Sequence, residues 1–316
     1  MVSATGVRIG WTDLPPGVRG AVERCLGSPV AAAVSQPGGF SPGTADRVVT
    51  ADGRRAFVKA VGCGISEAAL AFHRREARVA AALPPDAPAP RLLACHDDGE
   101  WIALVFEDVD GRHPRTPWDR DEVSAVFDAL AGLARAATPC PVPVPAAADQ
   151  CGPDLAGWRR VAADRPPALD PWVAAQLPAL RAAAGRALAG LDGQTLVHGD
   201  VRADNLLVRG DGTVAVVDWP HACRGPAWLD RLLLCINLLL FGGVDIDPLV
   251  ARLASDAAVP VGLLIDVLAG YTGYFLDAAR QPPPPGLPTL RAFQRAQADA
   301  LLPWVRQRLA GVSRVM

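Results

Sequence analysis

The sequence predicts an α+β fold in two parts. Residues 1–109 are expected to form a small β-sheet with one long helix, and residues 110–316 a larger, mainly helical part. Two observations indicate this division: β-like runs bounded by turn residues gather before residue 109, and stretches with apolar residues at helical spacing dominate beyond Gly111. The chain has 316 residues, half of them hydrophobic, which is enough to bury a large core.

In the first part we expect a β-meander, then a helix, then two more strands. Strands are predicted at 30–35, 47–50, 56–61, 92–97 and 101–107. Turn residues separate them, among them Ala51-Asp52-Gly53 and Asp98-Gly99. The Ala-rich segment 67–83 predicts the long helix, and Pro84-Pro85 would end it.

In the second part helical patterns dominate, over 120–137, 171–191, 227–241, 247–255, 261–279 and 289–309. Two short β-like runs, 195–197 and 213–217, interrupt them. The Pro-rich stretches 139–145 and 282–288 are typical of rigid connectors, so we do not place domain boundaries there.

The composition argues against several classes of partner. A formal net charge of −2 gives no general attraction to nucleic acid or to an anionic membrane. The longest apolar run, 232–241, is too short to cross a bilayer, and residues 1–10 lack the apolar core of a signal peptide. We therefore expect a cytoplasmic protein. Its seven scattered cysteines include no CxxC pair and are expected to be small buried hydrophobes.

Two residue types, lysine and asparagine, are strongly depleted. Of the 31 basic residues only Lys59 is a lysine, and asparagine occurs only at Asn205 and Asn237. A chain that uses arginine almost everywhere else has kept this one lysine, and a compact ammonium group is not interchangeable with a guanidinium in a tight site. Lys59 is therefore a candidate functional residue.

The segment 196–219, LVHGDVRADNLLVRGDGTVAVVDW, predicts the chemistry. It places Asp200, Asn205 and Asp218 on a strand–loop–strand unit, at intervals of five and thirteen positions. A carboxylate on a loop can orient or deprotonate a hydroxyl group, and an amide oxygen with a second carboxylate can hold Mg²⁺. Phosphoryl transfer needs these parts, because its transition state is mainly positioned and neutralised.

The HGD-x4-N run, followed by a hydrophobic-Asp-Trp motif, resembles the aminoglycoside phosphotransferase and choline kinase family, which has the bilobal protein-kinase-like fold. The resemblance covers nearly the whole chain. It implies that Lys59 binds the phosphates of ATP (or GTP), that Glu76 on the following helix holds Lys59, that Asp200 is the catalytic carboxylate, and that Asn205 and Asp218 are Mg²⁺ ligands.

The same resemblance implies roles for further segments. Gly38-Gly39-Phe40-Ser41 would be the loop that covers the nucleotide, although Pro42 and the single following glycine, Gly43, leave the usual GxGxxG incomplete. Phe106-Glu107-Asp108-Val109 would be the hinge whose backbone binds the nucleobase. Arg202 would face the transferred phosphate or form a salt bridge. Asp230 would brace the catalytic loop, and His198 would support it.

Three alternatives stay open. Residues 39–43 fit GxSxG, but a hydrolase needs a helix directly after the serine, where the sequence predicts strands. A protein kinase needs a long activation segment ending in an APE-like motif, and the interval between Asp218 and Asp230 is short. A pseudokinase usually lacks one of the key positions. The expected substrate is a small hydroxylated compound: an aminoglycoside, another antibiotic, a sugar or an amino alcohol.

Overall fold

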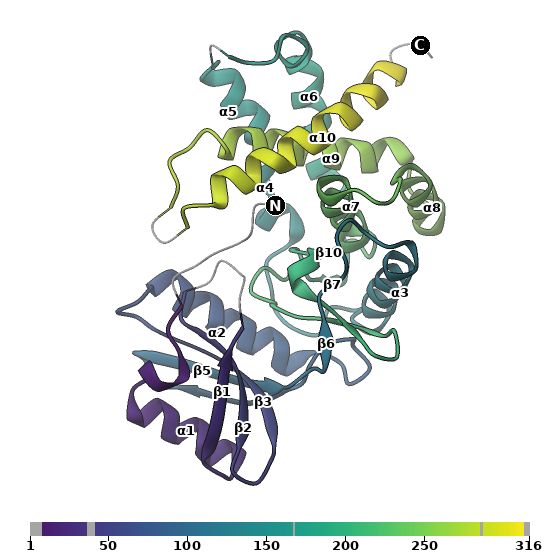
Figure 1. Cartoon of the computed structure of the whole chain (residues 1–316). Helices are drawn as coiled ribbons and strands as arrows, with labels where there is room; N and C mark the ends of the chain where they lie inside the picture. Colours follow the sequence, from purple (N-terminus) through teal and green to yellow (C-terminus); the bar gives the residue numbers. More distant parts are fainter. Residues whose placement is uncertain (1–7, 37–41, 167, 285–286, 313–316) are drawn as a thin grey trace.

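The computed structural model describes residues 8–36, 42–166, 168–284 and 287–312, and it has the expected bilobal, protein-kinase-like fold. The N-terminal lobe holds a five-stranded antiparallel sheet in the order β1-β2-β3-β5-β4 (Figure 1). Its strands are β1 (Val30–Ser35), β2 (Thr44–Thr50), β3 (Arg55–Gly62), β4 (Leu92–Asp97) and β5 (Trp101–Glu107). β3, which carries Lys59, is thus the central strand.

Two helices cover opposite faces of this sheet, because the side chains of a strand alternate between its faces. Val58 and Ala60 of β3 pack in one cluster with Val18 and Val22 of α1 (Pro16–Leu26). On the other face, Val61 packs with residues of α2 (Glu67–Ala82). Lys59 stands between Val58 and Ala60 in the sequence, so its side chain lies on the opposite face from theirs, the face that α2 covers.

The sequence predicted one helix in this lobe, so α1 is a correction. The local signals for it were present: Pro16 stands at the first helical position, and Gly27 ends the helix with a φ of 75°, a conformation that favours glycine. Gly17 and Gly20 weaken the helical pattern in between. β2 also begins at Thr44, three positions before the predicted start.

The C-terminal lobe is built from helices around a buried central one. They are α3 (Arg120–Ala136), α4 (Ala147–Leu155), α5 (Gly157–Ala163), α6 (Pro171–Ala189), α7 (Leu229–Phe241), α8 (Asp247–Ala257), α9 (Val261–Ala278) and α10 (Leu290–Val312). α9 packs against α4, α5, α6 and α10, and α10 crosses it in Figure 1. α9 is long and apolar enough to span a membrane, but 67% of it is buried inside the protein, as in the core helix of a globular fold.

Two helices of this lobe, α4 and α5, were not predicted. Pro153 inside α4 obscures the helical pattern, because proline disfavours helix interiors. α5 begins at Gly157, where a Cβ atom would lie 2.4 Å from the backbone of Gly273 on α9. Gly157 therefore permits a close approach of the two helices, which no local pattern reveals.

The segment that sequence reasoning singled out carries β7, β8 and β9, and two further short strands in the described part of the chain, β6 and β10, pair with them. β7 (Thr195–Val197) pairs with β10 (Cys223–Gly225), and β8 (Leu206–Arg209) pairs with both β6 (Gly111–Arg112) and β9 (Val214–Val216). The two predicted strands, β7 and β9, are thus confirmed but belong to different sheets, and β8 between them was not predicted. β6 lies just beyond Glu107 and already pairs within the second lobe, so we propose the division of the chain into residues 1–109 and 110–316.

The cysteines follow the prediction only in part. All seven are free, and Cys151, Cys223 and Cys235 are buried as expected. Cys25, Cys63 and Cys95 are exposed instead, and Cys140 is intermediate.

Candidate active site

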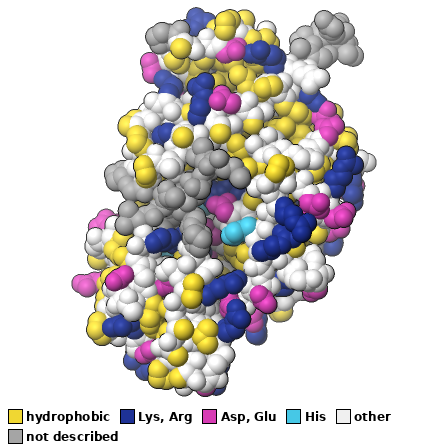
Figure 2. Space-filling model, in the orientation of Figure 1, with side chains coloured by type: hydrophobic (Ala, Val, Ile, Leu, Met, Phe, Trp, Pro, Cys, Tyr) yellow, Lys and Arg dark blue, Asp and Glu magenta, His cyan; other side chains and the backbone are white. Residues whose placement is uncertain are grey.

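A cavity of about 420 Å³ opens between the two lobes. β2, β3 and α2 line it on one side, and on the other lie the residues after β5, the loop between β7 and β8, and the residues after β9. On the face shown in Figure 2, acidic side chains and a histidine lie in the hollow between the lobes.

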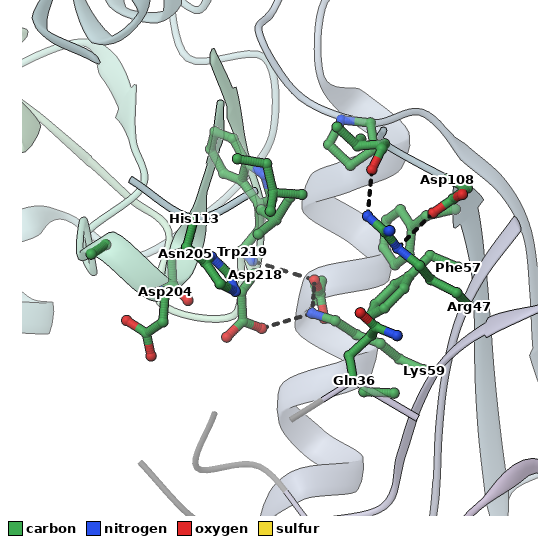
Figure 3. A pocket seen from close by; sticks show the side chains of 18 of the residues that line it. Gln36, Arg47, Phe57, Lys59, Asp108, His113, Asp204, Asn205, Asp218 and Trp219 are labelled. Atoms are coloured by element: carbon green, nitrogen blue, oxygen red, sulfur yellow. Dashed lines mark hydrogen bonds and ion pairs between the residues drawn. The ribbon is translucent and has the colours of Figure 1, made fainter. Parts of the chain in front are cut away.

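Lys59 joins the two lobes inside this cavity. Its Nζ donates to Oε1 of Glu76 at 2.7 Å and to Oδ1 of Asp218 at 2.8 Å (Figure 3). Asp218 is 159 positions away in the sequence. The Lys59 side chain is 14% exposed and that of Glu76 3%, so this ion pair is largely removed from water.

The electrostatics of this group keep Lys59 charged. Burial works to lower the pKa of Lys59, but the carboxylates of Asp218 and Glu76 outweigh it and raise the pKa above its usual range. Burial would raise the pKa of Asp218, yet the charge of Lys59 and its hydrogen bond hold it well below its usual range. Burial raises the pKa of Glu76, with Lys59 opposing. At neutral pH Lys59 is therefore a cation and Asp218 an anion, and the two form an ion pair.

Asp218 also has an unusual backbone. Its φ is 71°, in the left-handed region that residues other than glycine rarely adopt. Such conformations cost about 1–3 kcal/mol and concentrate at functional sites. The turn directs the Asp218 carboxylate back at Lys59, as Figure 3 shows.

The loop between β7 and β8 carries Asp200, Arg202 and Asn205. Arg202 bridges two carboxylates: its Nη1 lies 3.1 Å from Oδ2 of Asp200, and its Nη2 lies 2.9 Å from Oδ2 of Asp204. Asn205 donates from Nδ2 to the carbonyl oxygen of Asp200 at 2.8 Å and to its Oδ2 at 3.1 Å. Burial works to lower the pKa of Arg202, but Asp200 and Asp204 raise it above its usual range.

Two buried side chains fix the shape of this loop. Asp230, on α7, accepts hydrogen bonds from the backbone N–H groups of His198 (2.8 Å) and Gly199 (3.0 Å). His198 accepts from the N–H of Asp200 through Nδ1 at 3.2 Å, so its Nε2 carries the proton and donates to the Val217 carbonyl at 2.9 Å. His198 thus links the loop of Asp200 to the strand end before Asp218.

The predicted hinge also lines the cavity, but part of it is occupied by a side chain from β2. The Val109 carbonyl accepts from Nη2 of Arg47 at 2.6 Å, and Nε of Arg47 lies 3.0 Å from Asp108. A nucleobase would have to share that carbonyl with Arg47. The Glu107 carboxylate pairs with Arg91, whereas Phe106 is buried with its ring centroid 5.9 Å from the Lys59 ammonium.

The structure thus brings together Lys59, Glu76, Asp218, the loop with Asp200, Arg202 and Asn205, and the hinge segment. Gly38, Gly39, Phe40 and Ser41 lie outside the described residues. Directly after them β2 begins at Thr44, where a GxSxG hydrolase would need a helix.

Several residues that line the cavity were missed by sequence reasoning, among them Arg8, Arg47, Phe57 and His73. The alternation of side chains along a strand could have found two of these. Phe57 stands two positions before Lys59, so the two side chains lie on the same face of β3. Arg47 is opposite Phe57 on β2 and therefore lies on that face too. Burial, together with the charge of Lys59, lowers the pKa of His73 to about 4. Nothing local marks Arg8, which reaches the site because its backbone pairs with Gly43.

The donor set fits a hard divalent cation. Asn205 uses its Nδ2 within the loop, which leaves its amide oxygen available, and Asp218 engages Lys59 through Oδ1. Among the described residues there is no group of three or more His, Cys, Asp or Glu side chains that could hold a metal. Mg²⁺ suits such a sparse set, because it is usually held by one or two carboxylates with phosphate and water oxygens.

Comparisons with known proteins agree with this geometry. The family described as "Phosphotransferase enzyme family" matches residues 38–264. Solved structures that resemble the chain include an aminoglycoside phosphotransferase from Alicyclobacillus acidocaldarius, with a TM-score of 0.56, 19% identity, and coverage of 94% of this chain and 97% of that one.

Two further structures share the fold at lower identity. A thermostable mutant of the aminoglycoside phosphotransferase APH(4)-Ia, in complex with ADP and hygromycin B, has a TM-score of 0.56 and 15% identity, covering 92% of this chain and 98% of that one. A putative fructosamine-3-kinase from Haemophilus somnus has a TM-score of 0.56 and 12% identity, covering 90% and 96%. No curated protein sequence matches the chain.

Proposed function

Because the chain belongs to the phosphotransferase enzyme family, we propose that it is a small-molecule kinase that transfers the γ-phosphoryl group of Mg²⁺-bound ATP or GTP to a hydroxyl group. One observation carries the proposal: Lys59 of the central strand meets Asp218 of the other lobe at 2.8 Å, beside Asn205, in the cavity between the lobes. A fixed cation and two oxygen ligands at one place are what a nucleotide triphosphate requires.

On the nucleotide side, Lys59 would bind the α- and β-phosphates, and Glu76 would hold the Lys59 ammonium in position. Asn205 and Asp218 would hold Mg²⁺, which neutralises charge on the phosphates when bound. The low pKa of Asp218 keeps its carboxylate ionised at all physiological pH values, as a metal ligand must be.

On the acceptor side, Asp200 would orient the hydroxyl group and accept its proton. General-base assistance of this kind contributes on the order of 10²–10⁴ in rate. Arg202, whose guanidinium holds Asp200, would stabilise negative charge on the transferred group. The exchange of its Asp200 contact for a phosphate contact would free the carboxylate for the hydroxyl.

The acceptor would lie between this loop and helices α4, α9 and α10. Burial, together with the carboxylates of Asp154 and Asp200, raises the pKa of the Tyr274 hydroxyl on α9 to about 12. Tyr274 accepts from Nε2 of Gln294 on α10 at 3.3 Å. The Tyr274 hydroxyl is thus close enough to Asp154 of α4 and to Asp200 to feel both charges, and Gln294 of α10 binds it. This polar neighbourhood supports a small polyhydroxylated acceptor: an aminoglycoside, another antibiotic, a sugar or an amino alcohol.

The experiment is nucleoside diphosphate release from Mg²⁺-ATP and Mg²⁺-GTP across a panel of these four compound classes. Asp200→Asn runs alongside as the control. We expect one class to stimulate release in the wild type and not in the variant. Binding of nucleotide with no stimulation by any acceptor would favour a non-catalytic nucleotide-binding protein, and the absence of nucleotide binding would overturn the proposal.

A further inference from the structure

A second hollow, of about 520 Å³, lies in the C-terminal lobe, and none of the described residues lines both this hollow and the cavity between the lobes. It lies among α3, α7 and α8, which are neighbours at one edge of that lobe (Figure 1). Each helix contributes one arginine to its lining: Arg135 from α3, Arg231 from α7 and Arg252 from α8.

These arginines are poorly compensated. Arg231 and Arg252 share one carboxylate, that of Asp256, at 3.7 and 3.6 Å, which is longer than a charge-assisted hydrogen bond. Arg135 has no ion pair or hydrogen bond within the described part of the chain. Asp128 is the other carboxylate among the described lining residues, so three cations face two anions.

Arg231 is the most constrained of the three. Its side chain is 15% exposed, and its buried Nε has no hydrogen-bond partner among the described residues. Burial lowers the pKa of the Arg231 guanidinium and the nearby Arg252 and Arg135 lower it further, although Asp256 opposes them. A partly buried guanidinium next to two like charges costs stability, and Asp256 offsets only part of that cost, so a bound anion would stabilise this arrangement.

Arginine as a residue type carries little information in this chain, because it supplies all but one of the basic residues. The information lies in the placement of three arginines around one hollow that also has an apolar wall. That wall is formed by Ala131, Ala134, Ala227, Leu249 and Leu253. Guanidinium groups pair with phosphate and carboxylate oxygens in a fork geometry, and the wall offers contact for a carbon skeleton.

We propose that this hollow, defined by Arg135, Arg231 and Arg252, binds a small organic oxyanion, a phosphate ester or a carboxylate. The hollow is next to residues that hold the loop between β7 and β8, which carries Asp200. Arg231 follows Asp230, whose carboxylate holds the N–H groups of His198 and Gly199. Thr138, which lines the hollow, forms a hydrogen bond between its Oγ1 and Oγ1 of Thr195 on β7 at 2.7 Å. An occupied site would therefore stabilise the segment that carries Asp200.

The test is calorimetric titration of the full-length protein with three probes: inorganic phosphate, glycerol 3-phosphate and citrate. Arg231→Gln and Arg252→Glu are compared with Arg74→Gln, an exposed arginine of the other lobe that pairs with Asp97. Arg252 is 69% exposed, so its replacement preserves the fold even if Arg231→Gln does not.

We expect saturable binding of at least one probe, weakened about tenfold or more by each change in the hollow, unchanged by Arg74→Gln, and weakened by added salt. Binding of the phosphates alone or of citrate alone identifies which oxyanion the site takes. Binding that is equal in the wild type and in both hollow variants would overturn the proposal. So would the absence of saturable binding of every probe up to roughly 10 mM, a range that covers weak oxyanion sites. Either result is independent of the kinase assay.

Discussion

The buried ion pair of Lys59 gives the sharpest prediction about stability. Replacing Lys59 by Met removes the cation and leaves the carboxylate of Glu76, which is 3% exposed, without its ion-pair partner and beside the like charge of Asp218. Removing one partner of a buried pair costs about 3–5 kcal/mol, because the remaining charge stays desolvated. With a urea dependence of roughly 3 kcal/mol per molar, the midpoint of unfolding should fall by about 1–1.7 M.

The double variant Lys59→Met/Glu76→Gln separates the structural cost from the catalytic one. Without the buried carboxylate it should regain most of the lost stability, yet remain unable to turn over a nucleotide. Tryptophan fluorescence during urea unfolding at pH 7.5 measures the stability of each variant. The control is Arg74→Met, which breaks an exposed pair on the same helix as Glu76 and should leave the midpoint nearly unchanged. A Lys59→Met midpoint equal to that of the control would refute this reasoning.

Two further predictions concern Asp154 and Asp230. Burial raises the pKa of Asp154 from 3.8 to about 6, so its contribution to stability is present below pH 4 and is lost as the pH rises through 6. Asp154→Asn should therefore be more stable than the wild type at pH 8, by on the order of 2–3 kcal/mol, and equal to it at pH 4. Urea unfolding at both values measures this, and equal stabilities at pH 8 would contradict it. Asp230→Ala leaves the N–H groups of His198 and Gly199 unpaired, at about 1–3 kcal/mol each. It should lower both the urea midpoint and kcat while nucleotide affinity stays near that of the wild type, and an unchanged kcat would argue against a bracing role.

The sequence predicted the residues of the site that local patterns mark. The lone lysine on a strand and the spacing of Asp200, Asn205 and Asp218 predicted one site. In the structure Lys59, Asn205 and Asp218 line the cavity, whereas Asp200 is not among its described lining residues and contacts Asn205 and Arg202 instead. The roles of these residues stay predictions. The family match and the shared fold confirm the family and the bilobal kinase-like fold. Strands β4 and β5 lie where the two β-like runs on either side of the turn Asp98-Gly99 placed them.

What the sequence did not reveal depends on contacts between distant segments. Arg47 occupies the Val109 carbonyl across 62 positions, and Arg8 reaches the cavity through a bridge to Gly43. Neither contact leaves a local periodicity. α5 escaped prediction for a related reason, since Gly157 is required by the nearby backbone of Gly273 and not by its own neighbours in sequence.

The most direct test of the central claim is the identity of the phosphorylated product. Phosphorus NMR of the reaction with the stimulating acceptor should show a phosphomonoester forming in step with the nucleoside diphosphate. In Asp200→Asn the product should form about 10²–10⁴ times more slowly while Mg²⁺-nucleotide still binds. Inorganic phosphate in place of the ester, or an undiminished rate in the variant, would contradict the assignment of this cavity as a phosphoryl-transfer site.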